Sequence, residues 1–332
     1  MLRQYAFLLV IVIAIPSRAI LADMNDSNSA YTDTAGPYKV DVVRYDWADT
    51  HRSVPVKIYY PADCNTPCPL IVFSHGLGGS REGYEYLGHR WASWGYVSVH
   101  VQHKGSDSDI WQKVGIDFMT AMRKAAADPR NAIERPKDIS FAIDQMEKLN
   151  KETGIFKGRL DMNRIGVAGH SFGAYTTMAV AGQVLGGRLF QKNLADPRVK
   201  AAIPMSTPSN KLQSFNGAYD KIAIPCMHMT GTLDDSPIGN SPAKDRRIPF
   251  DQTKAPEQYL ITFIGGDHMI FSGRLKRNSI KGNEDEHFQS LIRVSTIVFW
   301  DAYLKNKPTA KAWLKNGGIR KLMGQDAVVE MK

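Results

Sequence analysis

Cysteine is scarce in this sequence: the 332 residues contain three, at positions 64, 68 and 226. Cys64 and Cys68 lie four residues apart, but no second Cys/His pair at ligand spacing accompanies them, which argues against a zinc site. In an oxidising compartment the two could close a local disulfide, a pairing that the spacing alone leaves open. Cys226 lies in an apolar run and is expected to be a buried thiol.

Clusters of one charge and long apolar runs are also missing after the N-terminus. Lys and Arg are spread along a chain with a formal net charge of +9, and no nucleic-acid-binding motif is recognisable. We therefore expect no nucleic-acid partner and interpret the charge as a solvated surface, with affinity for anionic surfaces as the alternative. There is no internal repeat and no low-complexity tract.

Residues 1–22 have the pattern of a secretory signal peptide. Arg3 precedes an apolar run over residues 6–15, and Ala19 and Ala22 offer two cleavage sites. The run is too short to span a bilayer comfortably. We therefore expect a secreted or periplasmic protein without a stable membrane anchor; an uncleaved anchor is the alternative.

The rest of the chain alternates short β-rich runs with helix-length segments. The runs cover residues 39–45, 54–60, 69–75, 96–101, 164–169, 199–205, 222–230 and 259–265. The first two alternate in polarity like antiparallel edge strands, whereas the later ones are nearly continuous apolar runs, typical of parallel strands covered on both faces. Helical spacing of apolar residues recurs over residues 81–95, 135–152 and 284–305.

This alternation predicts a single α/β domain over residues 38–332, with a mostly parallel central sheet of about eight strands and helices on both faces. Residues 23–37 are polar and aperiodic, so we expect a flexible lead-in. Residues 102–134 are longer than an ordinary loop and contain Trp111 and Phe118. We interpret them as an insertion over the active face; an extra packing helix is the alternative.

The stretch RIGVAGHSFGAYTTMAVAGQ, residues 164–183, contains the strongest chemical signal. A β-rich run leads into G-H-S-F-G, and an alanine-rich helical segment follows it. In such a strand–turn–helix, the serine is held on a sharp turn with its hydroxyl exposed, and the glycines prevent collisions with neighbouring elements. We therefore predict that Ser171 is a nucleophile.

A serine nucleophile needs a histidine base and an acid that orients it. His268 follows the run over residues 259–265 on a Gly-rich loop, and it comes after Ser171 and after a pair of aspartates in the chain. The other eight histidines lie in strands, helices or the serine turn, or precede the nucleophile. Asp234 and Asp235 both follow a strand and must diverge; we favour Asp234, with Asp267 as a weaker rival because it adjoins the histidine.

An oxyanion needs two backbone N–H donors. Phe172, directly after the nucleophile, is one candidate, and Leu77 in the loop FSHGLGGS, residues 73–80, is the other. Three glycines let this loop approach a substrate, and it lacks the Lys-Ser/Thr ending of a phosphate-binding loop. Segments that leave strand ends supply further candidates for the substrate pocket: His103, Trp111, Met205 and Ser206.

Five segments in this order carry a family resemblance: HGLGGSREGYEYLGHRWASWGY, RPKDISFAIDQM, GHSFGAYT, TGTLDDSP and GGDHMIF. Over about residues 40–305 the chain resembles α/β-hydrolases of the predicted dienelactone hydrolase group, which is related to platelet-activating-factor acetylhydrolases and cutinase-like polyester hydrolases. The resemblance implies an α/β-hydrolase fold, and it marks Asp234, His268 and Leu77 as site residues. Two departures stand out: dienelactone hydrolases proper use a cysteine where this chain has Ser171, and Leu77 replaces a tyrosine of the polyester hydrolases.

Together, the residues and the resemblance predict a secreted, monomeric serine carboxylic-ester hydrolase. It would act through an acyl-enzyme on small or short-acyl esters, without a metal or organic cofactor. Alternatives on the same three residues are a phospholipid acetyl group, a polyester or an amide as substrate. A binding protein on an inactive hydrolase scaffold would require a missing member of the triad, and none is missing.

Overall fold

The computed structural model of the chain describes residues 31–49, 52–112, 117–186, 191–209, 217–273 and 280–332. The expected signal peptide lies outside these residues. Among the helices that are described, none is both long and apolar enough to cross a membrane.

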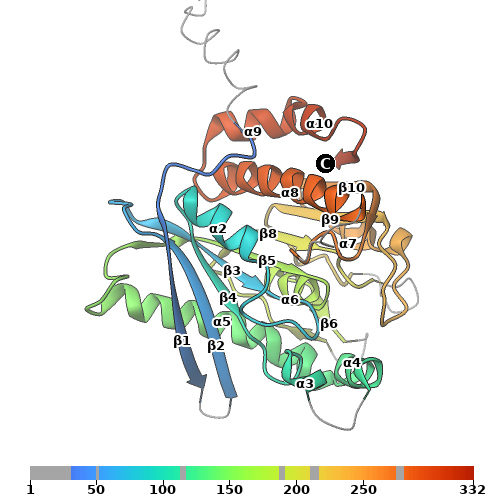
Figure 1. Cartoon of the computed structure of the whole chain (residues 1–332), viewed down its shortest axis with the longest axis horizontal. Coiled ribbons are helices and arrows are strands. Elements are labelled where there is room, and N and C mark those ends of the chain that lie inside the picture. The colour runs from blue at the N-terminus through green and yellow to red at the C-terminus, as the bar shows by residue number, and fades with distance from the viewer. Residues whose placement is uncertain (1–30, 50–51, 113–116, 187–190, 210–216, 274–279) are drawn as a thin grey trace, which may run out of the picture.

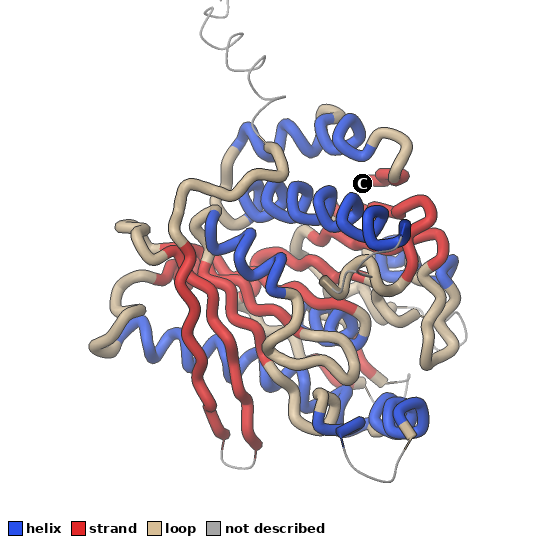
Figure 2. Tube along the Cα trace, viewed as in Figure 1, coloured by secondary structure: helices blue, strands red, loops and turns tan. Residues whose placement is uncertain are grey.

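A nine-stranded sheet forms the centre of the molecule (Figures 1 and 2), in the order β1-β2-β4-β3-β5-β8-β9-β10-β11. The strands are β1 (Val40–Asp49), β2 (Arg52–Pro61), β3 (Cys68–Ser74), β4 (Val97–Val101), β5 (Leu160–His170), β8 (Val199–Met205), β9 (Cys226–Leu233), β10 (Gln258–Asp267) and β11 (Ala327–Met331). The pairs β1–β2, β2–β4 and β10–β11 are antiparallel, and the other neighbours are parallel. A separate two-stranded sheet pairs β6 (Val184–Leu185) with β7 (Lys192–Asn193).

Helices cover both faces of the nine-stranded sheet (Figure 2). The helices of the described residues are α2 (Glu85–Ser93), α3 (Asp109–Gln112), α4 (Phe118–Ala127), α5 (Pro129–Lys151), α6 (Phe172–Ala181), α7 (Ile248–Gln252), α8 (Ile280–Tyr303), α9 (Pro308–Lys315) and α10 (Gly318–Met323), with a 3-10 turn η1 (Ala243–Asp245). Side chains of α2, α8, α9 and α10 form one apolar core, and those of α5 and α6 form the other.

The two cores explain the apolar runs of the central strands. In β3, Ile71 and Phe73 belong to the core under α8, whereas Leu70 and Val72 belong to the core under α5. Successive side chains of a strand point to opposite faces, so a strand covered on both sides is apolar at every position. The predicted mostly parallel sheet with helices on both faces is confirmed.

The structure differs from expectation at three places. Residues 31–37 of the expected flexible lead-in pack on the body: the Tyr31 hydroxyl donates to Asp301 at 3.0 Å, and Asp33 pairs with Arg90 and Arg293. The long helix begins at Pro129 rather than at residue 135, because the Asp128 carboxylate accepts from the N–H of Arg130 and caps it. The edge strand β11 was not expected at all.

Candidate active site

Ser171 occupies a strained turn between β5 and α6. Its backbone angles are φ 57° and ψ −119°, which a non-glycine residue rarely adopts. A Cβ atom at Gly173 would overlap the carbonyl oxygen of Ser74, and one at Gly169 would overlap the carbonyl group of Gly173. Glycine at both positions therefore lets the strand, the turn and the helix approach closely enough to expose the serine.

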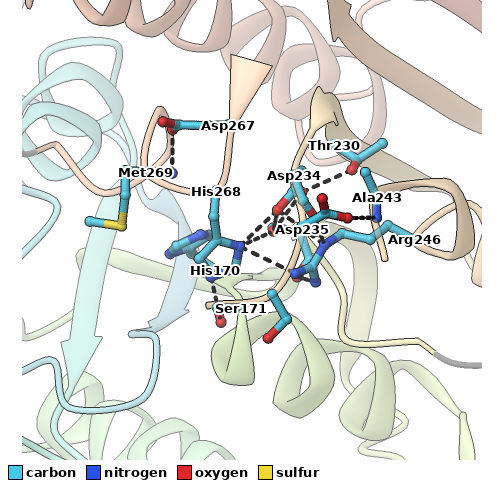
Figure 3. A network of polar contacts seen from close by, with 12 residues as sticks. His170, Ser171, Thr230, Asp234, Asp235, Ala243, Arg246, Asp267, His268 and Met269 are labelled. Atoms are coloured by element: carbon cyan, nitrogen blue, oxygen red, sulfur yellow. Dashed lines mark hydrogen bonds and ion pairs between the residues drawn. The ribbon is translucent and has the colours of Figure 1, made fainter. Parts of the chain in front are cut away.

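A chain of hydrogen bonds joins Ser171, His268 and Asp234 (Figure 3). His268 Nε2 lies 3.0 Å from Ser171 Oγ, and His268 Nδ1 lies 2.7 Å from Asp234 Oδ1. The histidine follows β10 and the aspartate follows β9, so neighbouring parallel strands deliver both side chains to the edge where β5 ends in the serine turn. The structure thus brings together the three residues that the sequence singled out.

The two rival aspartates point elsewhere. The Asp235 carboxylate accepts from the N–H of Ala243 at 2.8 Å, and the Asp267 carboxylate accepts from the N–H of Met269 at 2.8 Å (Figure 3). Each is engaged in shaping its own turn. Asp234 alone of the three contacts the imidazole in the described part of the chain.

Asp234 is fully buried and held by several donors. The Ser206 hydroxyl lies 2.7 and 2.6 Å from its two oxygens, and the Thr230 hydroxyl donates to it at 2.9 Å. Arg246 Nε lies 3.0 Å from the carboxylate and also donates to the Asp234 carbonyl oxygen at 2.7 Å. Burial lowers the pKa of Arg246, and the adjacent Asp234 opposes that effect. Together these donors fix the plane of the carboxylate that faces His268.

Arg246 is a site residue that the sequence reasoning missed. Its guanidinium also donates to the Ser206 carbonyl oxygen at 2.8 Å and lies 3.3 Å from His268 Nδ1. It belongs to the 3-10 turn region after β9, and nothing in the surrounding sequence distinguishes it from the exposed Arg247 beside it.

Comparisons with known proteins find similarity to ester hydrolases. The family model of platelet-activating factor acetylhydrolase, isoform II, matches residues 64–117. Platelet-activating factor acetylhydrolase of Cavia porcellus is 32% identical over 151 residues, which are 38% of this chain and 34% of that enzyme. Cutinase est1 of Thermobifida alba is 26% identical over 63% of this chain and 57% of that enzyme, and a cutinase of Thermobifida fusca (strain YX) is 24% identical over 63% and 56%.

The chain is an α/β-hydrolase related to these enzymes. The matched region spans about a third of the length of the acetylhydrolase and just over half of these two cutinases. The relationship confirms the resemblance that the five sequence segments indicated.

The glycine-rich loop, residues 73–80, lies against Ser171. A Cβ atom placed on Gly76 would be 3.4 Å from the Ser171 Cβ atom, and Leu77 lines the same cavity as Ser171. Phe172, the other residue expected to supply an oxyanion N–H, begins α6 directly after the serine. Both candidate donors therefore belong to segments that border Ser171.

A large cavity opens beside Ser171, with a volume of about 1320 Å³. The insertion expected over the active face forms one wall, through Trp111, Phe118 and Met122 from α3 and α4. Residues 236–241 and Ser272 form a more polar wall. The cavity therefore has an apolar side made by the insertion and a polar side made by the loop after β9.

Of the four residues expected in the substrate pocket, Trp111 lines the cavity, and the other three do not. Met205 is fully buried in the core, and Ser206 is turned onto Asp234 by a positive φ of 60°. His103 is fully buried, because its imidazole bonds Ser74 Oγ at 2.9 Å and Asp138 at 2.8 Å. Each lies at a strand end as expected, but its side chain points away from the pocket.

His103 thus belongs to a second Ser–His–Asp chain, behind the glycine-rich loop. Burial, with Arg135 and Arg52 nearby, holds the pKa of His103 well below its usual value, so this imidazole is neutral. Burial raises the pKa of Asp138 to about 6, although Arg52 pairs with it through two hydrogen bonds. Ser74, which accepts from Arg135 at 3.0 Å, is buried and does not border the cavity.

The described residues contain no group of three or more His, Cys, Asp or Glu side chains that could hold a metal ion. Cys64 and Cys68 have their sulfur atoms 3.2 Å apart and are free thiols in this structure. Cys226 is fully buried, as expected.

Proposed function

We propose that this α/β-hydrolase is a serine carboxylic-ester hydrolase that works through an acyl-enzyme. The observation that carries the proposal is the hydrogen-bonded chain from Ser171 through His268 to Asp234 at the wall of an open cavity. Names of the related proteins, an acetylhydrolase and cutinases, support the same class of reaction.

In the proposed reaction, Ser171 Oγ attacks the ester carbonyl carbon while His268 Nε2 takes its proton. Asp234 accepts from His268 Nδ1, which keeps the correct tautomer and stabilises the imidazolium. The N–H groups of Leu77 and Phe172 hold the oxyanion, and the imidazolium then protonates the departing alcohol. Water, activated by His268, attacks the acyl-enzyme and releases the acid and free Ser171.

For the substrate, we propose small or short-acyl esters. A cavity of about 1320 Å³ has room for more than a short acyl group, and its apolar wall from α3 and α4 suits an apolar substituent on the other side of the ester. This observation favours a second candidate on the same residues, an acetylated phospholipid. Polyester hydrolysis is a further alternative. We also propose that the protein is exported, because its N-terminal sequence has the signal-peptide pattern. That it acts as a monomer is a separate proposal.

The test is hydrolysis of p-nitrophenyl acetate, butyrate and octanoate by the mature chain and by Ser171→Ala. We expect hydrolysis of the short esters and a loss of at least about a thousandfold in kcat for the variant, because the nucleophile is removed. Circular dichroism of both proteins controls for folding. Equal rates for the two proteins would mean that Ser171 is not the nucleophile, and no hydrolysis of any ester would favour a binding protein.

A further inference from the structure

Trp111 joins the substrate cavity to the glycine-rich loop. The indole ring, with 37% of the residue exposed, lines the cavity together with Ser171 and Leu77. At the same time, its Nε1–H donates to the carbonyl oxygen of Gly78 at 2.9 Å. One side chain therefore borders the substrate space with its ring and holds the loop with its N–H group.

Two hydrogen-bonded peptide groups of the loop connect the Trp111 side chain to the N–H of Leu77. A trans peptide points its C=O and its N–H in opposite directions. With the Gly78 carbonyl held by Trp111, the N–H of Gly79 points the other way and donates to the carbonyl oxygen of Gly76 at 3.0 Å. That carbonyl belongs to the same peptide as the Leu77 N–H, which is therefore directed away from Gly79.

The Gly76 carbonyl oxygen accepts a second hydrogen bond, from the side chain of His75. The N–H of His103 donates to His75 Nε2 at 3.2 Å, so the His75 proton is on Nδ1, and Nδ1 donates to the Gly76 carbonyl at 2.6 Å. Burial lowers the pKa of His75 well below its usual value, which keeps this tautomer neutral. His75 orients the Gly76–Leu77 peptide, but it does not contact the Gly78–Gly79 peptide.

The Gly78–Gly79 peptide needs a restraint of its own. Gly78 has φ +70°, and glycine passes easily between positive and negative φ. A side chain at this position would meet Met122 Sδ at 2.7 Å and Trp111 Cδ1 at 3.2 Å, so the insertion packs directly on the bare backbone. The N–H of Gly78 belongs to the preceding peptide and donates to the Ser106 carbonyl at 2.9 Å. Among the contacts of the described residues, Trp111 is the side-chain donor to the Gly78 carbonyl.

We propose that Trp111 is a positioning and specificity residue: its N–H aligns the Leu77 oxyanion donor, and its ring contacts the apolar part of the substrate. This inference rests on the proposed ester hydrolysis. The substitution Trp111→Phe separates the two effects of this side chain, because phenylalanine keeps an aromatic ring but lacks the N–H donor.

The experiment compares Trp111→Phe and Trp111→Ala with the unmodified protein on p-nitrophenyl acetate and octanoate. Loss of one neutral hydrogen bond should lower kcat of Trp111→Phe about fivefold on both esters, with little change in KM. Trp111→Ala should show the same loss in kcat and, in addition, a raised KM for octanoate. Inhibition by a boronic acid, which forms a tetrahedral adduct with the serine, should weaken in Trp111→Phe by the factor seen in kcat.

Trp94→Phe is the matched control. Trp94 is half-buried, and its Nε1–H also donates to a backbone carbonyl, that of Thr34 at 3.3 Å; neither residue lines the cavity. We expect wild-type kcat for this variant. The proposal is overturned if Trp111→Phe keeps wild-type kcat, if it changes only KM, or if Trp94→Phe loses as much. Failure of the proposed function would instead appear as an absence of Ser171-dependent hydrolysis in the unmodified protein.

Discussion

At the scale of single residues, the site depends on a buried ion pair behind the histidine. The side chains of Asp234 and Arg246 are 0% and 1% exposed, so both charges lie in a region where water cannot replace a missing partner. The arginine also bonds two backbone carbonyl oxygens, which ties the turn after β8 to the turn after β9. The carboxylate that orients His268 is thus part of the packing of the molecule.

Removal of Arg246 should therefore destabilise the fold. We expect Arg246→Met to lower the free energy of unfolding by about 3–5 kcal/mol, because it leaves the Asp234 carboxylate buried without its cation. Arg246→Lys, which keeps a charge but not the planar fork, should lose less. Urea unfolding followed by circular dichroism measures the change.

The neighbouring Arg247 supplies the control. It is 43% exposed and pairs with Asp251 and Glu330 at the surface. Arg247→Met should cost no more than about 1 kcal/mol. An equal cost for the two methionine variants would show that burial of the Asp234–Arg246 pair has no special effect on stability.

The sequence indicated which residues lie near the site, but not the direction in which each side chain points. Ser171, His268 and Asp234 could be found because a turn motif and two strand ends place them at one edge of the sheet. Position at a strand end does not determine where a side chain points, as Met205 and His103 show. Arg246 could not be found, because its partners lie 12 and 40 residues away in the chain.

At the scale of elements, the turn between β5 and α6 depends on contact with β3. The Gly173 Cα atom packs against the carbonyl oxygen of Ser74, the last residue of β3 and the start of the glycine-rich loop. The first turn of α6 and that loop are therefore in backbone contact. A side chain between them would separate the nucleophile from the residues around Leu77.

Gly173→Ala tests this contact. We expect the added methyl group to lower the free energy of unfolding by at least about 2 kcal/mol, because the atoms it meets are backbone and cannot move alone. Hydrolysis by the folded fraction should also fall. Gly83→Ala is the comparison: its Cβ would meet only the Ser80 carbonyl at an ordinary 3.6 Å, so its unfolding free energy should change by less than about 1 kcal/mol. Equal stability of both variants would contradict the close contact.

Most of the elements could be predicted from periodicity, and the exceptions have physical reasons. Strands such as β3 are apolar throughout, so they stand out in the sequence. Residues 327–331 form a strand because they pair with the free edge of β10, and no pattern in the local sequence predicts that pairing. The start of α5 was missed because Pro136 lies inside the helix, whereas a proline is expected in the first turn of a helix and not in its interior.

At the scale of the whole molecule, the fold buries several histidines in neutral form. Burial lowers the pKa of His100 to about 3 and that of His228 to about 4, and it holds those of His75, His103 and His170 well below the usual value. Below pH 6.5 the unfolded chain takes up protons at these positions and the folded protein does not. Stability is therefore fully present above pH 6.5 and is lost as the pH falls toward the lowered pKa values.

Asp138 acts in the opposite direction. Its pKa is raised to about 6, so the folded protein gains relative stability as the pH falls from 6 toward 4. The stability gained from one carboxyl group is smaller than the stability lost from five histidines. We therefore expect a net loss of stability as the pH falls from 7.5 to 5.

His228→Gln isolates one contribution. At pH 5, a histidine that stays neutral in the fold costs about 2 kcal/mol, from 1.5 pH units at about 1.4 kcal/mol each. Glutamine cannot titrate and keeps a polar group toward Gln258. The difference in unfolding free energy between pH 7.5 and pH 5, measured by urea unfolding, should therefore be about 2 kcal/mol smaller in the variant. An unchanged difference would show that His228 is not neutral in the fold.

The buried chain of Ser74, His103 and Asp138 has a consequence for how such enzymes are recognised. Its hydrogen-bond lengths of 2.9 and 2.8 Å are each within 0.1 Å of the 3.0 and 2.7 Å in the chain through Ser171. A purely geometric search would report two catalytic triads in this protein. Of the two serines, Ser171 borders the cavity and Ser74 does not, so such a template needs solvent access as a criterion equal in weight to distance.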